Sequence, residues 1–272
     1  MLKSAVTISL VDEARAGPFV YHGGLADGFH RAALAGFDAV EIFPPSAEEL
    51  DLAAVRDLVQ RHGLGVAAVG TGAGWLRWKL RLTDPAEDVR RRAEDFIAAL
   101  IRVAAQLGAP AILGSMQGRW EGTVSRAQAL DWLAGSLDRL GAVAEKCGGG
   151  LLYEFLNRYE SNLCQTVDES LAWMDSLPVR PVRLLCDLFH MNIEEADVAA
   201  ALRRGGTRVG HIHFADSNRR AMGFGHTDLG SIGSALWDMR YDGYLSAEIF
   251  PLPDADAAAR QTMASFRQVQ SC

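Results

Sequence analysis

Short apolar runs alternate with longer amphipathic stretches along the whole chain. The short runs are mostly aliphatic and β-branched, which is typical of buried strands, and the longer stretches repeat apolar positions at helical spacing. The short runs are AVTISL (5–10), AVEIF (39–43), GVAAVG (65–70), AILGSM (111–116), LLYEFL (151–156), VRLLCDLF (182–189), VGHIHFAD (209–216) and YLSAEIF (244–250). This rhythm predicts about eight strand–helix units, the pattern of a (β/α)8 barrel.

Start and stop signals bound the amphipathic stretches. Asp84 before Pro85 predicts a helix cap, and Gly108 predicts the end of that helix. Ser125 predicts the start of another long helix, which ends in a glycine cluster at 148–150. Further helices are expected within residues 28–36, 52–63, 166–178, 196–206, 230–240 and 254–268.

The 272 residues have the length of two small domains or of one large single-core fold, and no Pro/Ser-rich linker divides them. We therefore expect one α/β domain, a TIM barrel spanning residues 1–272. A doubly wound open sheet is the alternative fold. The stretch GTGAGW (70–75) superficially resembles its glycine-rich fingerprint, but it follows the third predicted strand and lacks the full spacing.

Composition narrows the class of protein. A net charge of −7 with 27 Lys and Arg argues against a nucleic-acid-binding surface. No apolar stretch approaches the roughly 20 residues that a membrane span needs, and the first apolar run is too short for a signal peptide. The irregularly spaced cysteines predict reduced thiols and a cytoplasmic protein: Cys147, Cys164, Cys186 and Cys272.

The run LLYEFLNRYE (151–160) carries a carboxylate, Glu154, in the middle of an apolar segment. An unpaired buried charge is costly, so Glu154 either faces solvent at a strand edge or has a compensating cation or proton. The last four predicted strands all end in comparable groups: Glu154, Asp187 with His190, His211 with His213, and Glu248. Catalytic groups of TIM barrels lie at these strand ends.

Neighbouring strands lie about 5 Å apart, so their ends can converge on a single ion. Two Glu, one Asp and one His form an oxygen-rich set that suits Mn²⁺, Mg²⁺ or Co²⁺ better than structural zinc. A salt bridge or a loop cap explains any one of these residues alone. Because His211 and His213 are two positions apart, we expect them to point to opposite sides, with only one facing the barrel axis.

Four segments resemble the motifs of a known superfamily: YEFLNRYE, CDLFHMNIEE, GHIHFADSNRR and SAEIFP. They are similar to those of the xylose-isomerase-like sugar isomerases and epimerases, in particular the D-tagatose/D-psicose (ketose) 3-epimerases. The resemblance covers the C-terminal half strongly and the N-terminal half only in its barrel rhythm. The combination HxHxxxSNR with DLFHMNIEE is much more specific than any single residue.

The resemblance implies site residues. The implied metal ligands are Glu154, Asp187, His213 and Glu248. The residues implied to contact the hydroxyls or carbonyl of a sugar are Glu160, His190 and Arg219. His211 is then a packed strand residue or a support for the ligands. His190 is expected in the loop after its strand, and a purely structural histidine is the alternative there.

The implied chemistry is the removal of a proton next to a carbonyl, which gives an enediolate. One divalent ion, with Mn²⁺ preferred over Mg²⁺ or Co²⁺, stabilises the negative charge. Glu154 and Glu248 are expected to act as the acid/base pair on opposite faces of the substrate. The substrate is then a ketose or a related polyhydroxy carbonyl compound.

Aromatic residues are candidate walls of a sugar pocket. Trp120 and Phe250 follow predicted strands, and Trp75 and Trp78 lie in a 74–82 loop that forms a lid or an oligomer contact. Ordinary packing is the alternative for all of them.

Two further loops contain candidate residues. In the loop after the first strand, Phe19 or Tyr21 is a candidate for the aromatic residue that the ketose epimerases carry there. In residues 221–230, Asp228 is expected to cap a helix rather than to bind substrate, and the role of His226 stays open.

Other functions compete with this interpretation. An inosose or hydroxypyruvate isomerase or dehydratase of the same superfamily would use the same ion and carboxylates. A nuclease like endonuclease IV would need additional histidines after the third and fourth strands, where AVGTGAG and ILGSMQG have none. A non-enzymatic binding module would not need two opposed glutamates. We expect neither a nucleic-acid nor a membrane partner, and a homodimer or homotetramer formed through the loops of the barrel rim.

Overall fold

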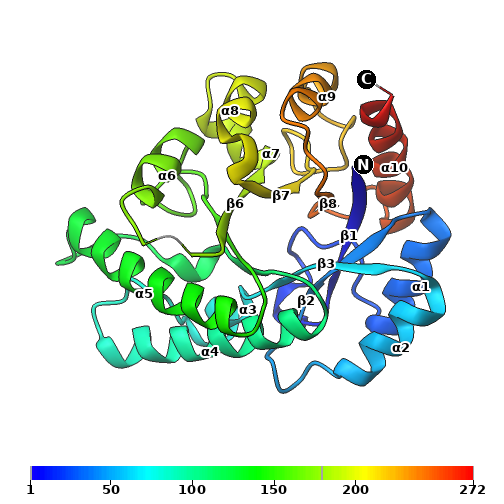
Figure 1. The fold of residues 1–272 in the computed structure, drawn as a ribbon. Helices are drawn as coiled ribbons and strands as arrows, with labels where there is room; N and C mark the ends of the chain where they lie inside the picture. The colour runs from blue at the N-terminus through cyan, green and yellow to red at the C-terminus, as the bar shows by residue number, and fades with distance from the viewer. Residues whose placement is uncertain (1, 179, 272) are drawn as a thin grey trace.

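The computed structural model describes residues 2–178 and 180–271. Within these residues, eight parallel strands close into a barrel in sequential order (Figure 1). The strands are β1 (Lys3–Ser9), β2 (Ala39–Phe43), β3 (Gly65–Gly70), β4 (Ala111–Leu113), β5 (Leu151–Glu154), β6 (Val182–Asp187), β7 (Val209–His213) and β8 (Tyr244–Ala247). Pairing of Lys3 with Tyr244 in register joins β1 to β8 and closes the barrel, which confirms the predicted (β/α)8 fold.

Helices surround the barrel, as Figure 1 shows. They are α1 (Leu25–Ala35), α2 (Leu52–His62), α3 (Ala73–Trp78), α4 (Glu87–Gln106), α5 (Arg126–Lys146), α6 (Val167–Met174), α7 (Leu188–Glu194), α8 (Val198–Gly205), α9 (Leu229–Asp238) and α10 (Ala255–Gln270). Short 3-10 turns are η1 (Asp12–Ala14), η2 (Ser115–Gln117) and η3 (Gly206–Arg208). Among the described residues, none of the helices combines the length and the apolar character that crossing a membrane requires.

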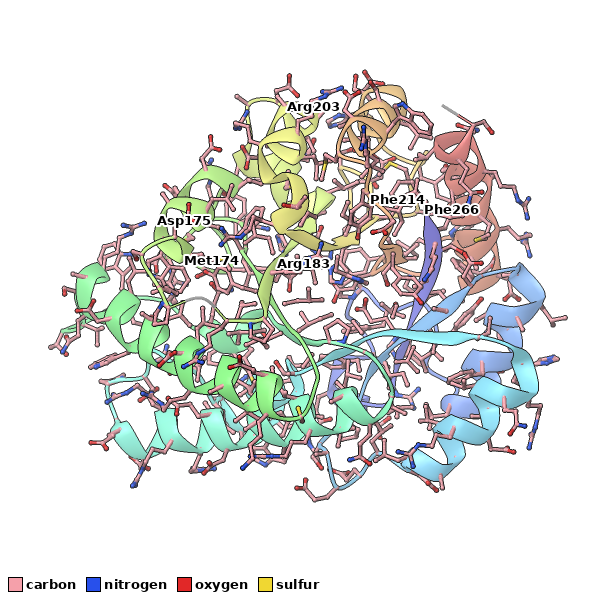
Figure 2. All side chains as sticks on the ribbon, in the orientation of Figure 1. Met174, Asp175, Arg183, Arg203, Phe214 and Phe266 are labelled. Carbon is pink, nitrogen blue, oxygen red and sulfur yellow. The ribbon has the colours of Figure 1, made fainter. Side chains whose placement is uncertain are left out.

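Most of the apolar core lies between the barrel and its helices, where side chains fill the space (Figure 2). Phe214 and Phe266, labelled in Figure 2, are both buried in this layer. A smaller apolar group comes from four neighbouring strands: Ala68, Ile112, Leu152 and Leu185. Because side chains alternate along a strand, Glu154 and Asp187 share a face with Leu152 and Leu185, two positions earlier. The barrel therefore carries these two carboxylates above an apolar layer.

Several predicted boundaries differ from the structure. The run predicted as a strand over 151–156 leaves the sheet after Glu154, yet Phe155 and Leu156 remain buried. Their apolar character reflects burial within the segment that follows β5 rather than pairing in the sheet. The helix predicted to be capped by Asp84 begins at Glu87, and Asp84 Oδ1 accepts a hydrogen bond from Ala86 N at 2.9 Å. The cap predicted at Ser125 is confirmed by its bond from Gln128 N.

The predicted position of His190 in a loop after its strand was wrong. Asp187 is the last residue of β6 and at once the N-cap of α7, because its Oδ1 accepts hydrogen bonds from Phe189 N at 2.8 Å and His190 N at 3.3 Å. His190 therefore lies in the first turn of a helix and not in a loop. The capping signal was present in the sequence, since Asp is a preferred N-cap residue, but the continuing apolar run Leu188–Phe189 suggested a longer strand.

Candidate metal centre

Four side chains from consecutive strand ends converge at the carboxyl end of the barrel: Glu154, Asp187, His213 and Glu248. The imidazole of His213 lies in the middle of the group. Its Nδ1 atom is 3.4 Å from Glu154 Oε1, 3.3 Å from Asp187 Oδ2 and 3.4 Å from Glu248 Oε2. One possible ligand atom from each residue lies within 4.8 Å of all the others. This spacing is short enough for the four atoms to share one ion.

Strand register explains this convergence. Asp187 and His213 end their strands and pair directly in the sheet. Glu154 pairs with Leu185, two residues before Asp187, so the ends of β5, β6 and β7 follow one another around the rim. Glu248 follows directly on Ala247, the last residue of β8. Consecutive strands thus place their terminal side chains around one point.

The cluster combines three buried or nearly buried carboxylates, and its pKa values reflect this. Burial raises the pKa of Glu248 to about 8, and the negative charges of Glu154 and Asp187 add to the effect. Burial also acts against ionisation of Asp187, but the positive charge of Arg219 and the nearby imidazoles outweigh it and lower that pKa. Burial opposes a charged His213 as well, yet the surrounding carboxylates raise its pKa well above the usual value. The site therefore favours additional positive charge.

This donor set fits a divalent cation. Three carboxylates and one imidazole provide hard oxygen ligands and one nitrogen, which suits Mn²⁺, Mg²⁺ or Co²⁺. Burial raises the pKa of Glu248 most, and the negative charges of Glu154 and Asp187 add to the rise; a cation bound here would offset both effects.

Arg219 lies against the cluster. Its Nη2 atom is 3.1 Å from Asp187 Oδ2 and also pairs with Glu248, and its Nη1 atom is 3.3 Å from His190 Nε2. The residue has a left-handed backbone with φ of 56°, and its carbonyl accepts a hydrogen bond from Phe250 N at 2.8 Å. The turn after β7 is thereby tied to the chain after β8, which directs the guanidinium into the site.

His190 and Glu160 complete the polar side of the site. His190 is buried, and its Nδ1 atom lies 2.6 Å from Asn157 Nδ2 and 3.9 Å from Glu160 Oε1. Its Nε2 atom is 3.9 Å from Glu154 Oε1. The Glu160 side chain is 49% exposed, which leaves it free to meet a ligand entering the rim.

A cavity of about 350 Å³ opens above the cluster. The charged residues and histidine around the candidate ion site line its polar side: Glu41, Glu154, Glu160, His190, Arg219 and Glu248. Its other wall is apolar and comes from the loop after β1, the end of β2 and helix α3: Pro18, Phe19, Phe43, Trp75 and Leu76. The rings of Phe19 and Phe43 stack at 4.5 Å between centroids. A small polyhydroxylated molecule has both hydrogen-bonding groups and C–H faces to match these two sides.

The aromatic predictions have mixed outcomes. Phe19 and Trp75 line the cavity, whereas Tyr21 is buried away from it. Trp78 contacts Phe96 with ring centroids 5.6 Å apart and stays outside the cavity. The predicted 74–82 loop begins as the short helix α3.

Trp120 and Phe250, the two predicted walls, do not line this cavity. Trp120 donates its Nε1–H to the carbonyl of Asn162 at 3.0 Å. Strand alternation does not carry from Glu248 to Phe250, because β8 ends at Ala247 and both residues lie beyond it. A contact of either ring with substrate stays a prediction.

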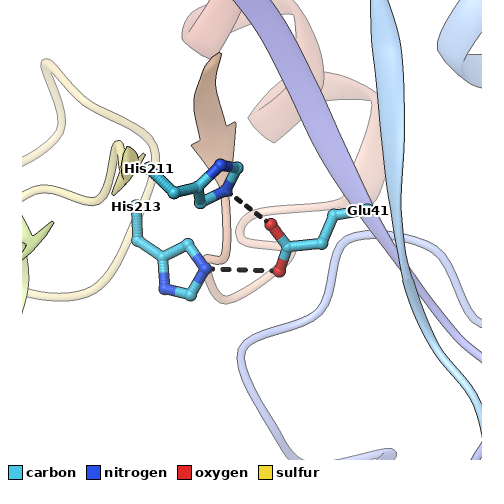
Figure 3. Close-up of side chains that lie close together, drawn as sticks. All are labelled: Glu41, His211 and His213. Carbon is cyan, nitrogen blue, oxygen red and sulfur yellow. Dashed lines mark hydrogen bonds and ion pairs between the residues drawn. The ribbon is translucent and has the colours of Figure 1, made fainter. Parts of the chain in front are cut away.

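Glu41 also belongs to this region, and it was not among the residues predicted from the sequence. Its Oε2 atom is 2.9 Å from His211 Nε2, and its Oε1 atom is 3.2 Å from His213 Nε2 (Figure 3). Burial acts against the charged form, but the positive charge and hydrogen bonds of both imidazoles outweigh it and lower the pKa of Glu41. An available signal was the acid within the apolar run AVEIF, the same signal that drew attention to Glu154.

The prediction that His211 and His213 point to opposite sides was wrong. Side chains alternate with a period of two, so residues i and i+2 lie on the same face of a strand. Both imidazoles accordingly point into the barrel, where they meet the same carboxylate (Figure 3). Their depth separates them, because only His213 also reaches the acidic cluster.

The loop between β7 and α9 holds Arg219, and only some of its functional residues were predicted from the sequence. Asp228 caps α9 by accepting bonds from Gly230 N and Ser231 N, as predicted. His226 is exposed, and its backbone N–H donates to Ser217 Oγ at 3.0 Å. The organising residue is the buried Asp216, which was not predicted. Its carboxylate accepts hydrogen bonds from four backbone N–H groups, those of Ser217, Gly223, Gly225 and Thr227.

The fold and the site together define a parallel α/β barrel with a candidate metal centre at the carboxyl ends of its strands. The chain belongs to the xylose isomerase-like TIM barrel family, whose sequence profile matches residues 29–269.

The chain is similar in sequence to several sugar epimerases. The chain is 30% identical to the L-ribulose 3-epimerase of Methylomonas sp. (strain DH-1), over 88% of this chain and 82% of the relative. It is also 30% identical to the D-psicose 3-epimerase of Ruminiclostridium cellulolyticum, over 81% of this chain and 76% of the relative. The structure of D-allulose 3-epimerase from Methylomonas sp. with D-allulose superposes with a TM-score of 0.82 at 26% identity, covering 98% of this chain and 97% of that one.

Proposed function

We propose that this protein is a divalent-metal-dependent ketose 3-epimerase. The main support for this proposal is the convergence of three carboxylates and one imidazole at the carboxyl end of the barrel. They lie beneath a cavity with one polar and one apolar side. The relatives named above are ketose 3-epimerases, and the chain matches them over most of their length. This similarity supports the same chemistry.

The ion is held by the four converging residues in this proposal: Glu154, Asp187, His213 and Glu248. Mn²⁺ is the preferred ion, with Mg²⁺ and Co²⁺ as alternatives, because the donor set is oxygen-rich with one nitrogen. When bound, the ion supplies positive charge that stabilises negative charge developing on neighbouring substrate oxygens.

Glu154 and Glu248 are the proposed acid/base pair. They belong to β5 and to the segment after β8, and both lie 3.4 Å from the same nitrogen of His213. A ketose bound between the two groups can lose its C3 proton to one carboxylate, which gives a planar enediolate. The other glutamate, in its protonated form, can then return a proton to the opposite face, which inverts the carbon. Because both carboxylates line the cavity, both can reach such a substrate.

Glu160, His190 and Arg219 are the proposed substrate contacts. Arg219 presents fixed donors, and His190 is held by Asn157, so both are preorganised for a carbonyl or hydroxyl oxygen. The exposed carboxylate of Glu160 is placed to accept a hydrogen bond from a hydroxyl at the cavity mouth.

Proton exchange at the reacting carbon tests this function directly. Purified protein loaded with Mn²⁺ is incubated in D₂O with D-psicose, D-tagatose, L-ribulose, an inosose and hydroxypyruvate, and each product is analysed by NMR. We expect deuterium at C3 of a ketose together with formation of its C3 epimer. Reaction of only the inosose or only hydroxypyruvate would assign the chain to another activity of the family, and no exchange with any compound would contradict an enzymatic role.

We further propose that the protein is cytoplasmic and assembles as a homodimer or homotetramer. The thiols of Cys147, Cys164 and Cys186 are free, which supports a reducing compartment, while Cys272 lies outside the described residues. Size-exclusion chromatography with light scattering tests the oligomeric state.

A further inference from the structure

Glu41 is a carboxylate buried in the barrel, with 3% of its surface exposed. It comes from β2, whereas the two imidazoles that it contacts come from β7, so the contact crosses the barrel interior (Figure 3). Each oxygen meets a different ring: Oε2 lies 2.9 Å from His211 Nε2 and Oε1 lies 3.2 Å from His213 Nε2. A carboxylate held at both oxygens has a fixed orientation.

The two nitrogens of His213 have different surroundings. Its Nδ1 atom is the one that lies among Glu154, Asp187 and Glu248, at 3.3 to 3.4 Å. Its Nε2 atom faces Glu41. A neutral imidazole carries one N–H and one lone pair, and a hydrogen bond from one nitrogen determines which nitrogen keeps the lone pair.

We propose that Glu41 is a positioning residue for the metal centre. By accepting the Nε2–H of His213, it fixes the ring orientation and leaves the Nδ1 lone pair directed at the ion. His211 has a supporting part, because it donates to the second oxygen of Glu41 and prevents that carboxylate from rotating away. Carboxylate partners of this kind orient metal-bound histidines and raise their basicity. The inference rests on the proposed function, since it presupposes that His213 binds an ion.

Glu41, His211 and His213 do not form a second ion site in this proposal, although their ligand atoms lie close enough together. The two separations of 2.9 and 3.2 Å are those of ordinary hydrogen bonds, and each carboxylate oxygen serves one ring. A second ion on Nε2 would require His213 to give up its ring proton while Nδ1 binds the first ion.

Metal binding, measured without any substrate, tests the proposal. Mn²⁺ is titrated calorimetrically into metal-free wild type, Glu41→Ala, Glu41→Gln and Asp187→Asn. We expect one ion per wild-type chain, about 10- to 100-fold weaker binding in Glu41→Ala, and a smaller loss in Glu41→Gln, whose amide oxygen still accepts the Nε2–H. The matched control is Glu195→Ala, which removes a buried carboxylate bonded to Val167 N outside the site and should leave the affinity unchanged.

The outcomes separate this inference from the proposed function. If wild type binds no Mn²⁺, or if Asp187→Asn binds like wild type, the metal centre itself is wrong. If that centre behaves as expected but Glu41→Ala binds Mn²⁺ as tightly as wild type, the positioning role is wrong. A second wild-type ion that disappears in Glu41→Ala would overturn it in favour of a two-ion site.

A second measurement does not depend on the folding of any variant. Wild-type protein with ¹⁵N-labelled histidines and saturating Mg²⁺ reports which nitrogen of His213 carries the proton. We expect a protonated Nε2 and an unprotonated Nδ1. The reverse assignment would contradict the proposal.

Discussion

At the scale of single residues, the site depends on where charge is placed and how it is compensated. Asp187 is fully buried, and it serves at once as a candidate metal ligand, as an ion-pair partner of Arg219 and as the cap of α7. Such a carboxylate has little freedom to move. Its position is therefore set before any ligand enters, which is how preorganised sites lower the cost of binding and catalysis.

Replacing the proposed acid/base residues should remove activity while leaving the fold intact. Glu154→Gln and Glu248→Gln each lose a group that can exchange a proton and also weaken one metal ligand. Loss of general acid/base catalysis costs about 10²- to 10⁴-fold in rate, so we expect kcat at saturating Mn²⁺ to fall by at least that range. Rates of epimerisation and of deuterium incorporation at C3 provide the measurement.

Glu195→Gln is the control for these two variants, because Glu195 is buried but lies outside the cavity lining. It should retain activity close to that of wild type. Normal C3 exchange in both Glu154→Gln and Glu248→Gln would show that neither carboxylate moves the proton.

Arg219→Lys tests the role of a fixed guanidinium. Separate nitrogens of Arg219 meet Asp187 and His190, and a lysine ammonium cannot reproduce that planar arrangement. We expect kcat/KM to fall about tenfold or more, equivalent to roughly 1.4 kcal/mol of lost transition-state stabilisation. Steady-state kinetics measure this effect, and Arg220→Lys, at the exposed neighbour, is the matched control. Equal kcat/KM values in the two variants would refute a specific role for Arg219.

At the scale of elements, the segment between β7 and α9 determines how the site is completed. It contains Arg219, and four of its backbone N–H groups donate to the buried Asp216 carboxylate. Gly223, one of the donors, has a φ of 98°, which a residue with a side chain adopts only with strain. A loop of this length keeps one conformation because a single carboxylate satisfies several of its N–H groups.

Stability of this segment should depend on pH through Asp216. Burial would raise its pKa, but hydrogen bonds from Thr227, Gly225 and Ser217 outweigh this and lower the pKa to about 2. A carboxyl whose pKa is lower in the folded state stabilises the fold above its unfolded pKa and loses this contribution as the pH falls toward the folded value. The stabilisation is thus complete at neutral pH and declines between about pH 4 and pH 2.

The matching variant is Asp216→Asn. We expect its unfolding free energy at pH 7 to be about 1–3 kcal/mol below that of wild type, because a charged acceptor of several hydrogen bonds is lost. Chemical denaturation at pH 7, 5, 4 and 3 should show the two stabilities approaching each other below pH 4. If the difference in unfolding free energy between the two proteins stayed constant from pH 7 to pH 3, the ionised Asp216 carboxylate would not be the source of the stabilisation.

At the scale of the whole molecule, an ion in the proposed centre would connect the ends of four consecutive strands. Metal removal should therefore lower the melting temperature of the entire barrel. At a free Mn²⁺ concentration of 100 times Kd, one site that binds only the folded state contributes about 2.7 kcal/mol. Differential scanning calorimetry with chelator and with added Mn²⁺ measures the shift, and Asp187→Asn should show little of it. Identical melting curves with and without Mn²⁺ in the wild type would count against the centre.

Much of this architecture follows from patterns that are local in the chain. The alternation of short apolar runs and amphipathic stretches predicted a closed barrel because each pattern reports the local period of burial. The positions of Glu154 and Asp187 followed from the same reasoning, since acids are rare at the ends of apolar strands without a partner or an ion. Motif resemblance was needed to choose His213 over His211.

What the sequence by itself determined was therefore the order of elements, the rim that carries the chemistry and the four candidate ligands. Only the tertiary structure decided which groups meet across the barrel. Glu41 lies 172 positions from His213 in the chain, and their contact depends on barrel closure and on the register of β2 and β7. Periodicity reports which face of an element is buried, but it carries no information about the partner that closure brings to that face. For that reason the pairing of Glu41 with both imidazoles, and the turn that brings Arg219 against the cluster, became visible only in three dimensions.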